Sequence, residues 1–201
     1  MNEKTNITQT QQKILNKGRE YFLEFGFSQA PLRKIVKDAG FTLGAFYGYY
    51  KTKEDLFYAL TDDIAQGFKA IILSVRQEMI KLPKEEQIFS MLDCYLSKLY
   101  EIVDYIDQNK TEMTLILKCS DGTKYENFME SFRLTNSQQI SKSVENTKIN
   151  SALIDMLMSG YFDILTRIMV ETQDKEQMYN LLRDVAIVYK NGIISLVKEE
   201  I

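Results

Sequence analysis

Apolar residues recur at intervals of three and four along most of the 201-residue chain, which is the spacing of one face of an α-helix. Only two prolines and nine glycines interrupt this pattern. It therefore predicts an all-α fold of about nine helices. The predicted helices cover residues 8–25, 31–39, 43–49, 53–79, 83–104, 111–118, 123–144, 151–171 and 175–198.

The stretch from residue 31 to 57 holds two short predicted helices joined by a tight turn. Pro31 suits a first helical position, because its φ is fixed near the helical value and its missing N–H has no partner there. Gly40 can take the left-handed conformation that ends a helix, and Thr42 can cap the next one. Two helices around such a turn form a helix-turn-helix, whose second helix lies in the major groove of DNA.

The second helix has the chemistry of a DNA-reading surface. Gly44 and Ala45 are small enough for a close approach to the groove, and Ala45 could contact a thymine methyl. Tyrosine and lysine side chains in and after the helix can donate to phosphate oxygens. In an arbitrary helical turn, core aromatics and solvated lysines would be the simpler explanation. The predicted DNA-binding residues are Arg33, Lys34, Thr42, Leu43, Gly44, Ala45, Tyr47, Tyr49, Tyr50, Lys51 and Lys53.

This stretch resembles the DNA-binding head of TetR/AcrR-type repressors. The resemblance is carried by Ile35-Val36, Ala39-Gly40, Thr42, Gly44, Tyr47, Tyr50 and Lys53, followed by Glu54 and Leu56. The resemblance is specific over residues 8–60. Beyond them the chain resembles the family only in its length and in the arrangement of its predicted helices. Ala30-Pro31-Leu32 lies where the family often has a Ser or Thr that caps the helix and contacts phosphate, and Tyr49-Tyr50 replaces a more usual His-Phe pair.

The charge distribution fits a separate DNA-binding part. The whole chain carries 25 basic and 28 acidic residues. Residues 1–60 hold nine basic and six acidic residues, whereas residues 61–201 hold sixteen and twenty-two. A basic head on an acidic body is typical of a DNA-reading module with a regulatory body. We predict a helix-turn-helix DNA-binding domain over residues 1–52 and a helical ligand-binding and dimerisation domain over residues 53–201.

The composition argues against an enzyme, a metalloprotein and a membrane protein. The chain has no histidine, no glycine-rich phosphate loop and only two cysteines, so neither a general base, a metal site nor a cofactor is expected. Cys94 and Cys119 are expected to be buried thiols, with a redox-sensing pair as the alternative. No apolar run approaches eighteen residues and no signal peptide is evident, which predicts a cytoplasmic protein without membrane contact.

The helices of the body predict two further functions. The helix over residues 53–79 would extend roughly 40 Å at 1.5 Å per residue and could link head to body. The last two helices are apolar on more than one side. The family resemblance implies that these two helices pair with their copies in a homodimer; a core within one subunit is the alternative. The residues assigned to this interface are Leu157, Gly160, Ile164, Ile168, Met178, Leu182, Val185, Tyr189, Gly192 and Leu196.

Aromatic and methionine residues are plentiful between residues 65 and 170. Such side chains line pockets for apolar or amphipathic small molecules, although they are also ordinary core residues. Because the body has more acidic than basic residues, a cationic ligand is also compatible with the sequence. The assigned pocket residues are Phe68, Met91, Tyr95, Met113, Leu117, Phe128, Phe132, Met158, Tyr161 and Phe162.

The sequence thus predicts a ligand-responsive transcriptional regulator, a homodimeric repressor of a palindromic operator on double-stranded DNA. The resemblance implies release from DNA by a small-molecule effector. The alternative is an all-helical small-molecule binding protein without functional DNA recognition, and an enzyme would require a nucleophilic cysteine. The identity of the effector, the operator and the regulated genes, and the choice between repression and activation, do not follow from the sequence.

Overall fold

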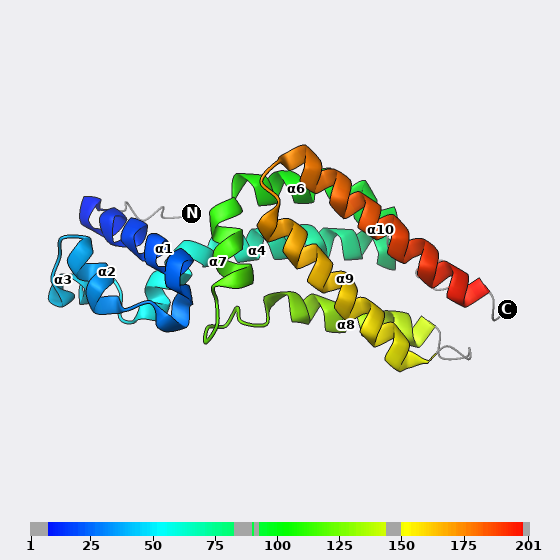
Figure 1. Cartoon of the computed structure of the whole chain (residues 1–201), viewed down its shortest axis with the longest axis horizontal. Coiled ribbons are helices and arrows are strands. Elements are labelled where there is room, and N and C mark those ends of the chain that lie inside the picture. Colours follow the sequence, from blue (N-terminus) through cyan, green and yellow to red (C-terminus); the bar gives the residue numbers. More distant parts are fainter. Residues whose placement is uncertain (1–7, 83–89, 91–92, 144–149, 199–201) are drawn as a thin grey trace. The chain divides into compact units, whose positions relative to one another are not determined.

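The computed structural model describes residues 8–82, 90, 93–143 and 150–198. Every regular element in these residues is a helix, as predicted (Figure 1). The helices are α1 (Gln9–Gln29), α2 (Leu32–Asp38), α3 (Leu43–Tyr47), α4 (Lys53–Ile80), α6 (Leu99–Gln108), α7 (Lys110–Lys118), α8 (Phe128–Ser143), α9 (Ser151–Glu171) and α10 (Lys175–Lys198).

The chain divides into two compact units. Unit 1 comprises residues 1–65 and 111–126, and unit 2 comprises residues 66–110 and 127–201. Helix α4 therefore contributes its first turns to unit 1 and the rest to unit 2. The boundary that we predicted after residue 52 divides a DNA-binding domain from a ligand-binding and dimerisation domain. This functional division stays a prediction.

Three phenylalanines form the centre of unit 1. The rings of Phe22, Phe27 and Phe57 lie 5.2 to 5.8 Å apart between centroids, and all three are buried. Gly26 has a φ of 73°, which breaks helix α1 and redirects the chain so that Phe27 enters the core. Phe25, the residue before this break, is 45% exposed.

Residues 111–126 pack onto the first helices of unit 1, although residues 66–110 separate the two segments in sequence. Arg19 forms an ion pair with Glu112 at 3.1 Å, and the Phe27 N–H donates to the Cys119 carbonyl at 2.8 Å. Asp62 accepts from the Lys124 ammonium at 2.8 Å and from the Tyr125 hydroxyl at 2.7 Å. These contacts fasten α7 and the loop after it to α1 and α4.

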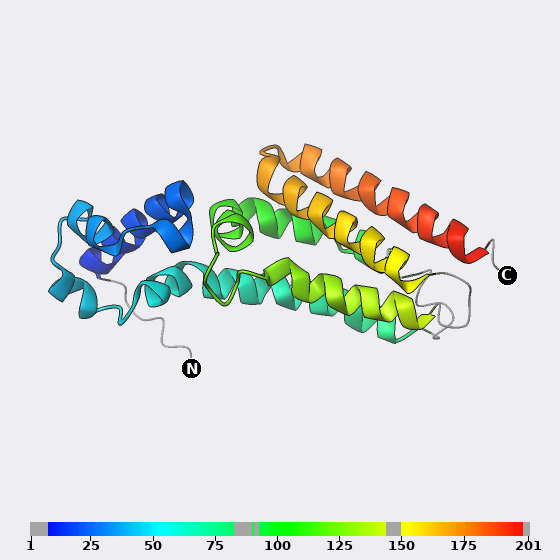
Figure 2. The same ribbon diagram turned by 60° about the horizontal axis from the view of Figure 1, so that its bottom comes forward.

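In unit 2, helix α9 packs between α8 and α10, and α10 also packs on α6 (Figures 1 and 2). Gly67 permits a close approach of α4 and α6, because a Cβ there would lie 2.1 Å from the Tyr105 hydroxyl oxygen. The Lys110 ammonium donates to the carbonyls of Met169 and Thr172 at 2.7 and 2.5 Å. A cation at this position satisfies carbonyls that the end of α9 leaves without helical partners.

Two predicted helix boundaries in unit 2 differ from the structure. The helix expected over residues 83–104 lies partly outside the described residues, and within them the backbone of Lys98 (φ −106°, ψ 1°) interrupts it before α6. Helix α6 then continues to Gln108. Helix α8 begins at Phe128 rather than near 123, because Gly122 has a φ of 82° and residues 120–126 form successive turns.

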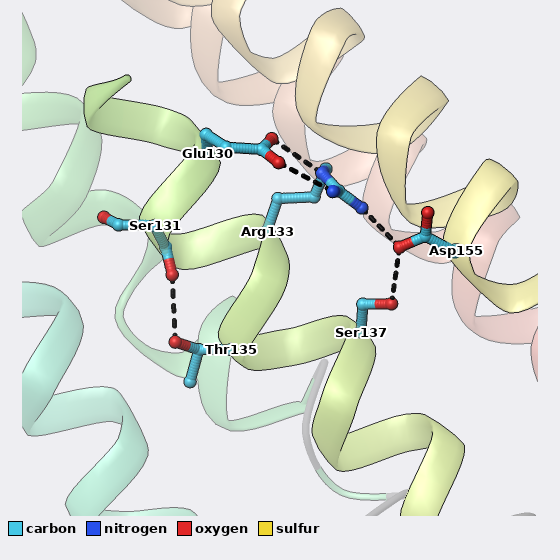
Figure 3. Close-up of polar contacts among 6 residues, drawn as sticks. All are labelled: Glu130, Ser131, Arg133, Thr135, Ser137 and Asp155. Carbon is cyan, nitrogen blue, oxygen red and sulfur yellow. Dashed lines mark hydrogen bonds and ion pairs between the residues drawn. The ribbon is translucent and has the colours of Figure 1, made fainter. Parts of the chain in front are cut away.

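Arg133 joins α8 to α9 (Figure 3). Its guanidinium donates to Glu130 on its own helix at 2.7 Å and to Asp155 on α9 at 2.5 Å, and its side chain is only 12% exposed. The Ser137 hydroxyl donates to the same Asp155 oxygen at 2.9 Å. These hydrogen bonds from Arg133 lower the pKa of both carboxyl groups.

We expect this arrangement to make unit 2 sensitive to acid. A carboxylate whose folded pKa is lowered adds stability above its unfolded pKa of about 4, and that stability is lost as pH falls through the folded value. Arg133→Met should unfold at lower temperature at pH 7 and lose less stability between pH 5 and 2 than the parent protein. Circular-dichroism melts across this pH range measure the effect. Arg167→Met, which removes an exposed ion pair with Glu171, is the control. If Arg133→Met loses as much stability between pH 5 and 2 as the control does, the prediction is contradicted.

Candidate functional site

The turn between α2 and α3 has the geometry of a helix-turn-helix. Gly40 has a φ of 86°, in the left-handed region that favours glycine. Its N–H donates to the Lys37 carbonyl at 2.9 Å, and the N–H of Phe41 donates to the Val36 carbonyl at 3.0 Å. These two bonds end α2 in a Schellman motif. Pro31 precedes α2 as its N-cap without a capping side chain, rather than as its first residue.

Helix α3 has one buried anchor and an open outer face. The Thr42 hydroxyl caps the helix by accepting from the Ala45 N–H at 3.3 Å, and Phe46 is fully buried. Gly44 is exposed, Leu43 and Ala45 are half-buried. The helix ends at Tyr47, two residues earlier than predicted, because Gly48 forms its C-cap.

Two tyrosines after this anchor reach solvent and a third does not. Tyr47 is 55% exposed and Tyr49 is 40% exposed, so both hydroxyls are available to a ligand. Tyr50 is only 5% exposed and its ring packs against Phe46, with 5.6 Å between centroids. The structure therefore places the Tyr50 ring in the core that supports α3 and not on the surface where the sequence predicts a phosphate contact.

Lys53 was also predicted to contact phosphate, but its ammonium faces the protein. It donates to the carbonyls of Phe27, Ser28 and Ala30 at 2.7, 3.2 and 3.1 Å, and lies 4.5 Å from the centroid of the Phe27 ring. An ammonium has three protons, and three carbonyls receive them. Burial lowers the pKa of Lys53. The structure thus places Lys53 as a cap on the end of α1.

The other basic residues of the predicted site are exposed. Lys51 precedes α4, where Thr52 and Asp55 cap each other's backbone: the Asp55 N–H donates to the Thr52 hydroxyl, and Asp55 accepts from the N–H groups of Lys51 and Thr52. This exchange is a capping box that fixes the backbone beside α3. Arg33 and Lys34 are exposed on α2. Lys37 on the same helix is exposed too, and the sequence reasoning did not single it out.

Unit 2 contains a cavity of about 330 Å³. Its walls come from the second part of α4, from α6, α8 and α9, and from Tyr95. The lining residues are Phe68, Lys69, Ile72, Leu73, Val75, Arg76, Tyr95, Ile102, Met129, Ser131, Phe132, Thr135, Asn136, Gln139, Met158, Tyr161, Phe162, Leu165 and Met169.

Six of the ten predicted pocket residues line this cavity: Phe68, Tyr95, Phe132, Met158, Tyr161 and Phe162. Phe128 does not line it; its ring is buried against those of Phe68 and Phe132. Met113 and Leu117 belong to α7 in unit 1 and do not line it either. Met91 lies outside the described residues. The sequence missed the polar lining contributed by α8, because its spacing resembles that of an exposed helix face.

The predicted dimer stripe on α9 and α10 is partly internal. Met178 and Leu182 are fully buried, with 0% of their surface exposed to solvent, and Ile168 is buried as well. A Cβ on Gly160 would lie 3.1 Å from the Tyr189 hydroxyl oxygen, so these two positions meet within one subunit. Leu157, Val185 and Leu196 are half-buried; Ile164 and Gly192 are exposed. The buried members of the stripe form subunit core, because α10 packs on α6 as well as α9.

Both cysteines are free thiols. Cys119 is buried in unit 1, and Cys94 is half-buried in unit 2. Burial raises the pKa of each thiol, so little thiolate is present at neutral pH. Among the described residues, no group of three or more acidic or cysteine side chains is placed to hold a metal ion, and no helix combines the length and apolar character needed to cross a membrane.

Residues 14–60, which run from α1 through the turn and α3 into α4, match the family of bacterial regulatory proteins called tetR. The helix-turn-helix region of this chain is therefore of the tetR type. The chain is 26% identical over 78 residues to the HTH-type transcriptional repressor Rv1474c of Mycobacterium tuberculosis, and the aligned part covers 36% of this chain and 42% of that repressor. The chain spans less than half the length of the curated relatives that it matches.

Solved structures of tetR-family regulators have the same fold over nearly the whole chain. A regulator from Chloroflexus aurantiacus superposes with a TM-score of 0.56 at 12% identity, covering 93% of this chain and 94% of that one. The regulator FadR from Bacillus subtilis, crystallised with stearoyl-CoA, gives a TM-score of 0.50 at 16% identity, with 90% and 98% covered. At these identities the likeness shows the fold alone.

Proposed function

We propose that this protein is a tetR-family transcriptional regulator that binds a palindromic operator as a homodimer and leaves it when a small molecule enters the unit 2 cavity. The observation that carries the proposal is the outer face of α3. It presents small residues and free tyrosine hydroxyls beside exposed basic side chains, on a turn whose geometry is fixed by Gly40.

The contacts with DNA divide into two groups. The N-terminal residues of a recognition helix approach base edges, which assigns that role to Thr42, Gly44 and Ala45. Tyr47, Tyr49 and Lys51 flank them and would donate to phosphate, which sets position on the duplex without reading sequence. Arg33 and Lys34 on α2 would contact the backbone across the groove.

Dimerisation is supported by apolar side chains that unit 2 leaves on its surface. Met156 on α9 is 71% exposed and Val188 on α10 is 67% exposed; Leu153, Ile164 and Leu181 are more than a third exposed. An apolar face on two adjacent helices suits a second copy, and a dimer would set two α3 helices one DNA turn, about 34–36 Å, apart. This set replaces Met178 and Leu182, which the subunit core uses.

A mass measurement tests the dimer. The parent protein is expected to elute as a species of twice the chain mass in size-exclusion chromatography with light scattering. Met156→Glu with Val188→Glu should elute as a monomer with unchanged helix content, because both side chains are on the surface. Gln77→Glu with Gln177→Glu, at exposed positions outside this face, should stay dimeric. A dimer that persists in the first double variant would exclude this face.

The effector step is supported by the cavity and by the path of α4. The complex of FadR with stearoyl-CoA indicates that a fold of this kind can hold a small molecule with an acyl chain. A ligand that binds better to one arrangement of the heads shifts the population toward it and away from DNA. Helix α4 belongs to both units, so it is the element on which we place this coupling.

The decisive experiment is a mobility-shift titration with DNA from the region flanking the protein's own gene, repeated across a salt series. The regulator should bind a discrete site at nanomolar concentration and bind random DNA of equal length far more weakly. Binding that stays non-specific up to tens of micromolar, from a protein that still binds small molecules, would favour the alternative of a ligand-binding protein without DNA recognition.

A further inference from the structure

The cavity of unit 2 is apolar at its floor and open at one side. Its floor comes from buried side chains of α9, from Phe68 on α4 and from Ile102 on α6. The α9 residues are Met158, Tyr161, Phe162, Leu165 and Met169. The exposed lining residues come from α4 and α8, so the mouth lies between these two helices.

Among the described residues, none of those that form the floor has a charged side chain, so the floor offers no counter-charge to a charged ligand group. The polar groups it offers include the hydroxyls of Tyr95 and Tyr161. Burial raises the pKa of both phenols, so both stay neutral at physiological pH. An ion buried among such groups would lose its hydration without gaining a counter-charge. The floor therefore suits the apolar part of a ligand.

The mouth carries charge of one sign. Among the described residues that line the cavity, the charged ones are Lys69 and Arg76, both on α4 and both exposed. They are seven residues apart, which is about two helical turns, so they lie on the same side of the helix. The Lys69 ammonium lies 5.3 Å from the centroid of the Phe128 ring, a contact that leaves its charge unneutralised.

Two carboxylates near the lining residues of α8 and α9 are paired with Arg133 and so do not offset this charge. Glu130, between the lining residues Met129 and Ser131, is held by Arg133. Asp155 on α9 is held by the same guanidinium (Figure 3). None of the described lining residues is acidic, so the acidic excess of the body, which on sequence grounds was compatible with a cationic ligand, does not extend to the part of the cavity wall that the structure describes.

We propose that the cavity binds an amphipathic anion, with an acyl-type tail on the aromatic and methionine floor and a carboxylate or phosphate head at the mouth beside Lys69 and Arg76. This inference rests on the proposed effector role of the cavity and names the chemistry of the effector. A volume of about 330 Å³ lies at the small end of ligand sites, so a single-chain amphiphile fits better than a two-chain lipid.

Probe ligands that share one alkyl tail and differ in their head group separate the contribution of the tail to affinity from that of the head-group charge. Binding of dodecanoate, dodecyl phosphate, dodecanol and dodecyltrimethylammonium is measured by calorimetry below the concentration at which each forms micelles. The two anions should bind at least tenfold more tightly than the cation, and the stronger of the two identifies the head. Octanoate should bind more weakly than dodecanoate, because a shorter tail buries less apolar surface.

Variants at the mouth test the two basic residues. Lys69→Gln with Arg76→Gln should remove the preference for anions while leaving dodecanol affinity unchanged, since both side chains are on the surface. Arg167→Gln with Arg183→Gln removes the same charge at positions outside the cavity and should keep the preference. Equal affinity for the cation and the anions, or an anion preference that survives in the mouth variant, would overturn the proposal.

Mobility-shift assays on the parent protein and the mouth variant distinguish a failure of this inference from a failure of the proposed function. If the anions bind with the expected preference but no DNA is bound, the regulator proposal fails and the ligand assignment stands. If the operator is bound and dodecyltrimethylammonium releases it better than dodecanoate, the regulator proposal stands and the ligand assignment fails. Release by dodecanoate alone, lost in the mouth variant, supports both.

Discussion

Gly44→Glu is expected to abolish operator binding while leaving the fold intact. Gly44 is exposed on α3, and a Cβ there would meet only the Thr42 hydroxyl, at 3.7 Å. The variant would place a carboxylate toward the phosphates and base acceptors of the groove. Like charges brought together in an interface cost several kcal/mol, and a dimer would meet this cost twice, so affinity should fall by roughly a thousandfold or more.

The control for this variant is Gly44→Gln, which has nearly the same size without the charge. Mobility shifts on the operator and circular-dichroism melts are measured on both variants and on Gln77→Glu, which adds the same charge on α4 in unit 2. We expect Gly44→Gln to lose less affinity than Gly44→Glu, and Gln77→Glu to bind as the parent does. Operator binding by Gly44→Glu at parental affinity would remove α3 from the interface.

Lys53→Met is expected to destabilise unit 1, with only a small direct effect on DNA binding. The substitution leaves the carbonyls of Phe27, Ser28 and Ala30 without the ammonium that they now share. Hydrogen bonds to a charged group contribute about 1.5–3 kcal/mol, so the free energy of unfolding should fall by about 2 kcal/mol or more. Urea denaturation measures the loss, and hydrogen exchange should become faster in peptides covering residues 24–30.

Lys51→Gln is the matched comparison, because Lys51 is exposed and donates to DNA in our proposal. Each lysine–phosphate contact adds about 0.9 to the slope of log affinity against log salt, so a dimer should lose about 1.8 from that slope in Lys51→Gln. Lys53→Met should keep the parental slope at a temperature where unit 1 is folded. If Lys53→Met has parental stability and a smaller slope of log affinity against log salt, Lys53 contacts phosphate as the sequence predicted.

The local signals in the sequence were sufficient for the helices and for the turn. Helical periodicity, Gly40 and Thr42 each act within a few residues, because a helix face, a left-handed C-cap and a side-chain cap depend on neighbours in the chain. The same reasoning placed six residues on the cavity, since a large apolar side chain inside a helical body faces either core or cavity. It could not separate these two outcomes, as Phe128 illustrates.

Contacts between distant residues decided the rest. Tyr50 and Lys53 match the family pattern and have donors that suit phosphate, but the packing of Phe46 and the end of α1 direct both side chains inward. Residues 111–126 join unit 1 through partners more than sixty positions away, and α10 buries Met178 and Leu182 against helices of its own subunit. Which of several apolar or charged positions faces solvent is set by the neighbours that packing supplies. The sequence by itself determined the helices, the turn and the types of side chain available to DNA, whereas only the tertiary structure decided which of those side chains are free to bind.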